Sequence, residues 1–209
     1  MTEQDIVYLD NAATTFPKPE AVYIAMDSFY RQYGGNAGRG ANPLARKASA
    51  LVDETRILAQ TWLNVPEVVF TSSATVALNT AILGARLRTG DIVYTTPFEH
   101  NSVLRPLEYL RQNIGIEIKL IPFDKITFAC DLDKLVKQFQ LDKPAMVCIT
   151  QASNVTGYMP PVEQIIQYAK QANSDAVTIV DGAQVAGLKT IDMTNVDALI
   201  FSGHKSLYG

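Results

Sequence analysis

A lysine near the end of the chain stands in a setting that suits covalent chemistry. Lys205 follows His204 and comes shortly after the apolar run 198–201, which predicts a buried strand. Most lysines lie in water, and a solvated surface side chain is the ordinary interpretation. A lysine near buried or cationic groups instead has a lowered pKa, so that its neutral amine can attack an aldehyde. The sequence therefore makes Lys205 a candidate nucleophile.

A carboxylate ends another apolar run. Asp181 follows the predicted strand 177–180, and Gln184 stands three residues further on. Together with Lys205, this acid suits a pyridoxal 5'-phosphate (PLP) site, in which a lysine binds the aldehyde and an acid keeps the pyridine nitrogen protonated. Gln184 could then donate a hydrogen bond to the ring hydroxyl. The alternatives are that Asp181 caps the turn at Gly182 and that Gln184 is an exposed turn residue.

A phosphate group would find donors at two places. The segment 71–75 joins a predicted strand to a helix, and the free N–H groups of a helix N-terminus attract anions. Ala74 and Thr75 open that helix, although serine capping alone also explains Ser72 and Ser73. Near the lysine, Ser202 and His204 could donate to the same group, while a hydrogen-bonded core histidine is the plainer interpretation of His204.

Two further polar residues follow predicted strands. His100 comes after the strand 92–95 and could stack its ring on a flat cofactor, and Asn154 comes after the strand 145–150. Each is also an ordinary loop residue. Ligands collect at the carboxyl ends of strands in open α/β sheets, and five strand ends here offer complementary groups. We therefore favour a shared site over separate caps.

The elements that must position these residues alternate between helix and strand. Several strands are continuous apolar runs, which predicts a mostly parallel sheet covered by helices on both faces. The residues before Phe16 lack helical periodicity, and the segment 10–15 is typical of a loop. The predicted strands are 68–71, 92–95, 116–121, 145–150, 177–180 and 198–201, and the predicted helices are 19–33, 43–62, 74–88, 102–112, 132–139 and one opened by Pro161.

Composition excludes several functions. The 209 residues have a net charge of −3 without a basic run, which disfavours nucleic acid or an anionic membrane as a partner. Cys130 and Cys148 have neither metal-ligand spacing nor a disulfide pattern, so we expect no metal site. The polar start 1–5 is unlike a leader peptide, and no apolar stretch approaches membrane-spanning length. A reduced cytoplasmic setting is expected.

Six segments together resemble the class V aminotransferase family of PLP enzymes, in its cysteine desulfurase-like branch. They occur in family order along nearly the whole chain. Ser73 and Val76 depart from residues that are frequent in relatives, which leaves the pattern recognisable. The matching segments are 8–15 (YLDNAATT), 70–79 (FTSSATVALN), 99–106 (EHNSVLRP), 153–157 (SNVTG), 181–184 (DGAQ) and 202–205 (SGHK).

The resemblance implies a role for each matching residue. Lys205 would form the Schiff base, Asp181 would pair with the pyridine nitrogen and Gln184 with the ring hydroxyl. His100 would stack on the ring and relay protons. Phosphate ligands would be Ala74, Thr75, Ser202 and His204, and Asn154 would lie near the cofactor hydroxyl and the substrate carboxylate.

The resemblance also implies fold, reaction and partners. The fold would be the large domain of fold-type I PLP-dependent transferases in residues 16–209, with its C-terminal part missing and residues 1–15 associated with a small domain. A homodimer would convert L-cysteine to L-alanine and pass the sulfur to an enzyme cysteine outside this chain, and from there to an acceptor protein. The family's loop cysteine and substrate-carboxylate arginine have no counterpart here, which predicts an N-terminal fragment or the product of a truncated gene.

Two alternatives remain open at this point. One is a different PLP reaction on the same residues, such as selenocysteine lysis, transamination or epimerisation. The other is an inactive truncated fragment or a binding module.

Overall fold

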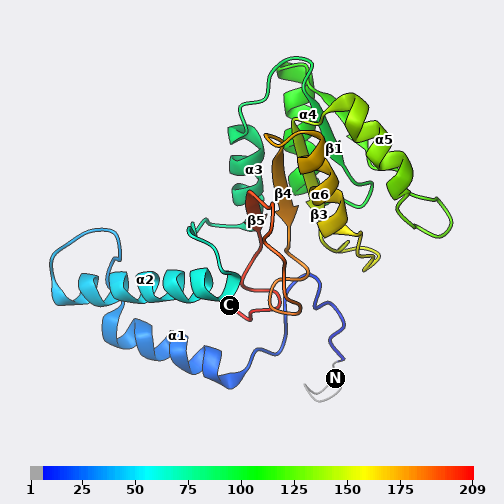
Figure 1. The fold of residues 1–209 in the computed structure, drawn as a ribbon. Helices are drawn as coiled ribbons and strands as arrows, with labels where there is room; N and C mark the ends of the chain where they lie inside the picture. Colours follow the sequence, from blue (N-terminus) through cyan, green and yellow to red (C-terminus); the bar gives the residue numbers. More distant parts are fainter. Residues whose placement is uncertain (1–6) are drawn as a thin grey trace. The chain divides into compact units, whose positions relative to one another are not determined.

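The computed structural model describes residues 7–209, which form two compact units (Figure 1). Residues up to Phe70 together with Gly203–Gly209 make the first unit, and Thr71–Ser202 make the second. The predicted features of the polar start 1–5 lie outside the described residues. None of the helices described is long and apolar enough to span a membrane.

The first unit contains two helices. Helix α1 spans Glu20–Tyr33 and helix α2 spans Pro43–Leu63. Asn42 caps α2, because its Oδ1 accepts the N–H of Ala45 at 2.9 Å and Pro43 occupies the first helical position. Both helices agree with the predicted helices 19–33 and 43–62.

The second unit is built on a five-stranded sheet in the order β2-β1-β3-β4-β5, and every neighbouring pair is parallel. This confirms the predicted α/β class with a mostly parallel sheet. The strands are β1 Ile92–Thr95, β2 Glu117–Leu120, β3 Met146–Thr150, β4 Val177–Asp181 and β5 Ala198–Ile200. The helices are α3 Ala74–Gly84, α4 Asn101–Asn113, α5 Leu132–Asp142 and α6 Val162–Ala172.

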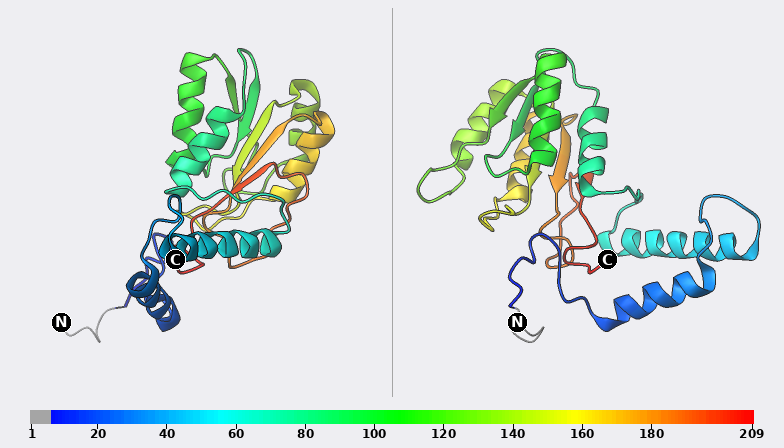
Figure 2. Two further views of the ribbon diagram at one scale, coloured as in Figure 1. Left: turned by 90° about the vertical axis from the view of Figure 1, so that its left-hand side faces the viewer. Right: turned by 180° about the vertical axis from the view of Figure 1, so that it is seen from behind.

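Helices cover both faces of this sheet (Figure 2). Alternation along β3 explains the two cores, because Met146 and Cys148 face one side while Val147 and Ile149 face the other. The first core includes residues of α3 and α4, and the second includes residues of α5 and α6. All five residues of β3 are buried, as its continuous apolar run predicted.

The predicted strand 68–71 is wrong. A strand forms only where a neighbour pairs with its backbone, and these residues have no strand partner in the described part of the chain. Their apolar side chains are correspondingly open, with Val69 81% and Phe70 49% exposed.

Two helix boundaries also differ from the prediction. Helix α3 ends at Gly84 rather than near residue 88, because glycine is a poor helix former and Arg86 adopts a left-handed φ of 53°. Helix α4 begins at Asn101, one residue before the predicted start, and Pro106 lies inside it. The lost backbone hydrogen bond is tolerated where Val103 and Leu107 bury their side chains in the first core.

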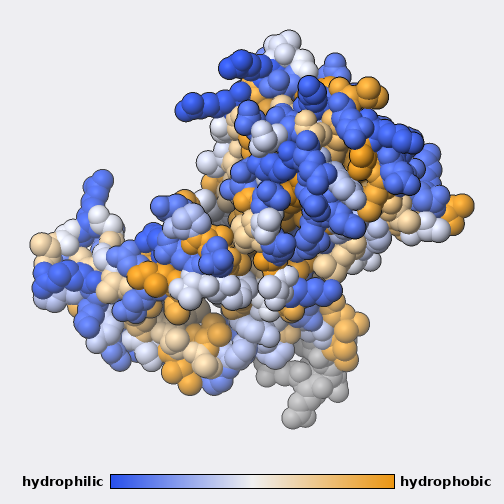
Figure 3. All heavy atoms as spheres, viewed as in Figure 1, coloured by the Kyte–Doolittle hydropathy of each residue, from blue (hydrophilic) through white to orange (hydrophobic). Residues whose placement is uncertain are grey.

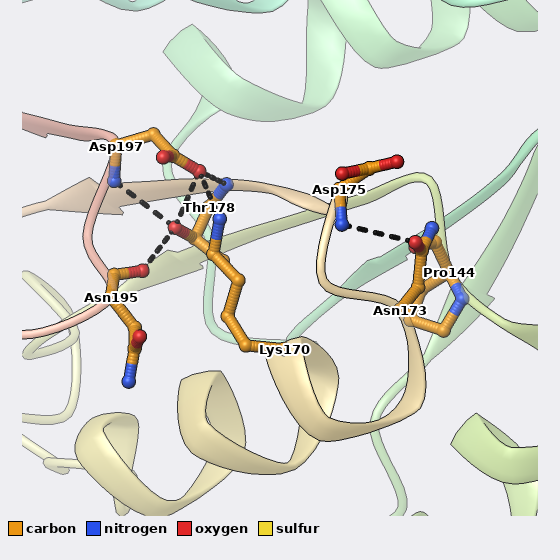
Figure 4. A network of polar contacts seen from close by, with 7 residues as sticks. All are labelled: Pro144, Lys170, Asn173, Asp175, Thr178, Asn195 and Asp197. Carbon is orange, nitrogen blue, oxygen red and sulfur yellow. Dashed lines mark hydrogen bonds and ion pairs between the residues drawn. The ribbon is translucent and has the colours of Figure 1, made fainter.

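A polar network lies where β4 and β5 begin, at the other end of the sheet from Asp181 (Figure 4). Asp197 Oδ2 accepts the backbone N–H of Thr178 at 2.8 Å and pairs with Lys170 Nζ of α6 at 2.8 Å. Burial alone would raise the pKa of Asp197, but these partners lower it below its ordinary value. The network therefore fastens α6 to the sheet away from the candidate site.

Packing of α5 gives a matched test of the second core. Leu135 is fully buried and Leu141, on the same helix, is 84% exposed. We expect Leu135→Ala to lower the free energy of unfolding by about 2–5 kcal/mol, because a cavity replaces a packed side chain. Leu141→Ala is expected to change it by less than about 0.5 kcal/mol. Urea denaturation of both variants measures this, and equal losses would contradict the packing described.

Candidate functional site

Parallel strands bring the candidate residues of the second unit to one edge of the sheet. Thr150 at the end of β3 is in register with Asp181 at the end of β4, and Asp181 is in register with Ile200 of β5. The segments that follow β1, β3 and β5 therefore start at the same edge, and they carry His100, Asn154 and Ser202.

Asp181 is buried at this edge and anchors the turn that follows. Only 4% of its surface is exposed, and its Oδ1 accepts the N–H of Ala183 at 3.0 Å. A Cβ at Gly182 would lie 2.8 Å from Leu199 Cδ1, so a larger residue there would have to displace the Leu199 side chain. The same turn carries the half-buried Gln184. Turn capping and cofactor binding are thus compatible roles for one carboxylate.

His100 is held in one orientation by the helix that follows it. It is the N-cap residue of α4, and its Nδ1 accepts the backbone N–H of Ser102 at 3.1 Å. A neutral imidazole that accepts at Nδ1 carries its proton on Nε2. His100 therefore has a structural role as the cap of α4, in addition to its position in the loop after β1.

Ser102 connects His100 to the first turn of α3. Its Oγ lies 2.8 Å from His100 Nδ1 and 2.8 Å from Thr75 Oγ1. Ser102 thereby connects two of the predicted site residues, His100 and Thr75, and Thr75 is a predicted phosphate ligand. Sequence reasoning did not single out Ser102, because its contact with Thr75 joins two helices that are far apart in the sequence.

The N-terminus of α3 has the geometry expected of an anion site. Ser73 caps it, with Oγ accepting the N–H of Val76 at 3.2 Å, as predicted from Ser72 and Ser73. Ala74 and Thr75 are the first residues of this 11-residue helix. Their backbone N–H groups lie at the positive end of the helix dipole.

Asn154 and Ser202 have less structural definition. Asn154 is exposed in a turn closed by a hydrogen bond from the N–H of Ser153 to the carbonyl of Tyr158, at 2.9 Å. Ser202 follows β5 and is half-buried. The structure places both residues just after strands of the sheet.

His204 and Lys205 belong to the first unit, where a segment from the start of the chain holds them. Thr15 Oγ1 donates to the carbonyl of Lys205 at 2.5 Å, and Thr14 Oγ1 donates to the carbonyl of His204 at 3.0 Å. His204 Nδ1 lies 3.1 Å from Thr14 Oγ1. Sequence reasoning used Thr14 and Thr15 only as part of a motif, and long-range pairing of this kind leaves no signal in local periodicity.

Fold and site together define a class of protein. A parallel sheet covered by helices, with an acid, a histidine cap and a helix N-terminus at the carboxyl edge, is the architecture of the large domain of fold-type I PLP-dependent transferases. More narrowly, the chain belongs to the family described as Aminotransferase class-V, whose model matches residues 7–209.

Individual relatives agree with this assignment. A probable cysteine desulfurase of Pyrococcus abyssi is 32% identical over 99% of this chain and 51% of its own length. A cysteine desulfurase of Pectobacterium carotovorum subsp. carotovorum is 32% identical over 99% and 51%. The apo structure of cysteine desulfurase from Thermococcus onnurineus NA1 superposes with a TM-score of 0.89 at 32% identity, over 99% of this chain and 52% of that one. The chain thus spans about half the length of these relatives.

Proposed function

We propose that this chain provides the PLP-binding part of a cysteine desulfurase-like enzyme. The observation that carries the proposal is a 32% identical cysteine desulfurase structure that superposes over 99% of the chain. In the proposed reaction the C–S bond of L-cysteine breaks, the sulfur joins the thiol of an enzyme cysteine as a persulfide, and L-alanine is released. As a domain assignment, residues 1–15 associate with a small domain and residues 16–209 bind the cofactor.

The described residues fit PLP in charge and geometry. The α3 N-terminus with Thr75 suits a dianionic phosphate. Asp181 supplies a buried carboxylate for a protonated ring nitrogen, and burial in a low-dielectric setting strengthens that pairing. Both features lie at the carboxyl edge of one sheet, where α/β folds bind their ligands. When bound, PLP supplies an electron sink for a carbanion at the substrate α-carbon.

Each residue has a distinct proposed task. Lys205 binds the cofactor covalently and carries protons on Nζ, while Asp181 pairs with the ring nitrogen and Gln184 with the ring hydroxyl. His100 stacks on the ring and presents the proton on its Nε2, because Ser102 occupies Nδ1. Ala74, Thr75, Ser202 and His204 bind the phosphate, and Asn154 lies near the cofactor hydroxyl and the substrate carboxylate.

Neither cysteine of this chain suits the sulfur-accepting role. Cys148 is fully buried, and burial raises the pKa of its thiol well above the ordinary value. Burial also raises the pKa of Cys130 to about 11. Both therefore remain protonated thiols at neutral pH, and only the thiolate is a good nucleophile. The proposed acceptor is accordingly a cysteine outside this chain, which then serves an acceptor protein.

Cys130 permits a direct check of that assignment. We expect Cys130→Ser to leave the rate of alanine release unchanged, because the thiol takes no part in sulfur transfer. Alanine release from L-cysteine, by purified PLP-loaded protein that also carries the proposed acceptor cysteine, measures both the desulfurase reaction and the exclusion of Cys130. Alanine formed at wild-type rates by the variant supports them, whereas loss of activity in a folded Cys130→Ser variant would place the sulfur acceptor inside this chain. No alanine from the wild-type protein would contradict the desulfurase proposal itself.

A homodimer in the cytoplasm completes the proposal. The helices α1 and α2 expose many apolar side chains (Figure 3), which favours burial against a second copy. Sedimentation equilibrium is expected to give twice the mass of one chain, and a monomer would contradict the dimer. The exposed apolar residues of the two helices are Tyr23, Ile24, Met26, Tyr30, Leu44, Leu51, Ile57, Leu58 and Trp62.

The proposed cytoplasmic location agrees with the state of the cysteines. Both are free, which suits a reducing compartment.

A further inference from the structure

A buried carboxyl group with no assigned role lies directly before His100. Glu99 is nine-tenths buried, and its Oε1 accepts two hydrogen bonds, from Thr96 Oγ1 at 2.6 Å and from the backbone N–H of Thr150 at 2.8 Å. Its second oxygen, Oε2, is buried without a hydrogen-bond partner among the described residues. An unpartnered buried oxygen is costly, so its retention calls for a physical explanation.

The two hydrogen bonds of Glu99 connect the segments that carry two candidate residues. Thr96 begins the turn after β1 that leads into His100. Thr150 ends β3 and is in register with Asp181 on β4. One carboxyl group therefore ties the turn before the histidine to the strand end beside the acid.

We propose that Glu99 is a positioning residue of the candidate site: its carboxyl group fixes the turn before His100 against the end of β3, and its charge state is linked to the charge that Asp181 carries. This inference rests on the proposed function, because it concerns a site that binds PLP. It adds a residue that acts through His100 and Asp181 and does not itself touch the cofactor.

Electrostatics give the linkage its direction. Burial raises the pKa of the Glu99 carboxyl to about 7, the hydrogen bonds from Thr96 and Thr150 oppose this, and the nearby charge of Asp181 adds to it. The titratable groups that interact with it are Asp181 on β4 and Cys148 on β3, with His100 next to it in the chain. Two neighbouring carboxylates disfavour each other's ionisation. When Glu99 is neutral, Asp181 is therefore the residue of this pair that carries the negative charge.

A cation paired with Asp181 weakens that preference. Once Asp181 is neutralised by a protonated ring nitrogen, burial still favours the protonated form of Glu99, but the added repulsion from Asp181 is reduced. Linkage is reciprocal, so an ionised Glu99 in turn favours the protonated form of the bound cofactor. A purely structural Glu99 would show no such dependence, which separates the two roles experimentally.

The first test uses the protein without cofactor. A carboxyl whose pKa is higher in the folded state, near 7, than its ordinary value of 4.5 binds more protons when folded, so stability falls as pH rises between these values. We expect the melting temperature of the wild type to fall across this window more steeply than that of Glu99→Gln, which keeps an acceptor oxygen. Thr96→Val removes a hydrogen bond that lowers the pKa of Glu99. The melting temperature of this variant is therefore expected to keep falling up to a higher pH than that of the wild type. Glu163→Gln, an exposed glutamate on α6, is the control and should follow the wild type.

The second test adds pyridoxal 5'-phosphate and follows the absorption of the bound cofactor with pH. We expect Glu99→Gln to move the midpoint of the spectral change to lower pH by about half a unit or more, because a negative charge that stabilises the protonated cofactor is gone. Glu163→Gln is expected to leave the midpoint unchanged. Identical midpoints for Glu99→Gln, Glu163→Gln and wild type would overturn the inference, as would parallel melting profiles. If the wild type shows no absorption of bound cofactor, the proposed function itself is contradicted. That result is distinct from a failure of the inference about Glu99.

Discussion

The Lys205→Ala variant is expected to lose the covalent bond to PLP and to lower the rate of alanine release by about 10²- to 10⁴-fold, the contribution of a positioned proton-transfer group. Lys205 Nζ is the proposed nucleophile toward the cofactor aldehyde and the proposed proton carrier. An alanine can do neither, although the phosphate and ring contacts remain. The variant is therefore expected to bind PLP reversibly, with dialysis removing the cofactor.

The matched control for this change is Lys125→Ala. Lys125 is an exposed lysine in the loop before α5, and its loss leaves the proposed site intact. Spectra of both variants, and alanine assays with protein that also carries the proposed acceptor cysteine, measure the difference. A Lys205→Ala protein that keeps its cofactor through dialysis and turns over at the rate of the Lys125→Ala protein would assign the covalent bond to another residue.

The Asp181→Asn variant is expected to keep its fold and to lower the rate about 10²- to 10³-fold, the size of effect that a lost electrostatic stabiliser produces. Asparagine preserves the shape and the Oδ1 that accepts the N–H of Ala183. It removes the negative charge that would keep the ring nitrogen protonated, and with it much of the electron sink. The loss should fall mainly on kcat, because the stabilised charge develops in the reaction.

Asp175→Asn is the corresponding control, because Asp175 is exposed in the turn before β4 and lies away from the carboxyl edge of the sheet. Steady-state kinetics and melting curves distinguish the two effects. Equal rates for Asp181→Asn and Asp175→Asn would contradict the role of Asp181, whereas a collapse of the melting temperature only in Asp181→Asn would make it a structural residue.

Local patterns predicted most of the helices and strands in both units. Continuous apolar runs gave the strands of a parallel sheet, because burial on both faces removes the alternation of polar residues. Helix starts at Asn42 and Ser73 were predictable since capping depends on adjacent residues alone. The same reasoning failed at residues 68–71, where an apolar run without a pairing partner does not become a strand.

In the candidate site, too, some residues were predictable from the sequence and others were not. Asp181, His100 and Thr75 were predictable, because side chains that follow parallel strands or open a helix meet at one edge. Ser102 and Glu99 were not, since their importance depends on hydrogen bonds to Thr75 and Thr150 across the fold. The contacts of Thr14 and Thr15 with His204 and Lys205 join opposite ends of the sequence and are likewise invisible to periodicity.

The most direct test of this account is to incubate the protein with PLP, reduce it with borohydride and map the modified lysine by mass spectrometry. Reduction makes the lysine–cofactor bond permanent, so the position of the label reports the site without depending on turnover. The account predicts a single pyridoxyl group on Lys205. A label on another lysine, or none on a folded protein, would contradict it.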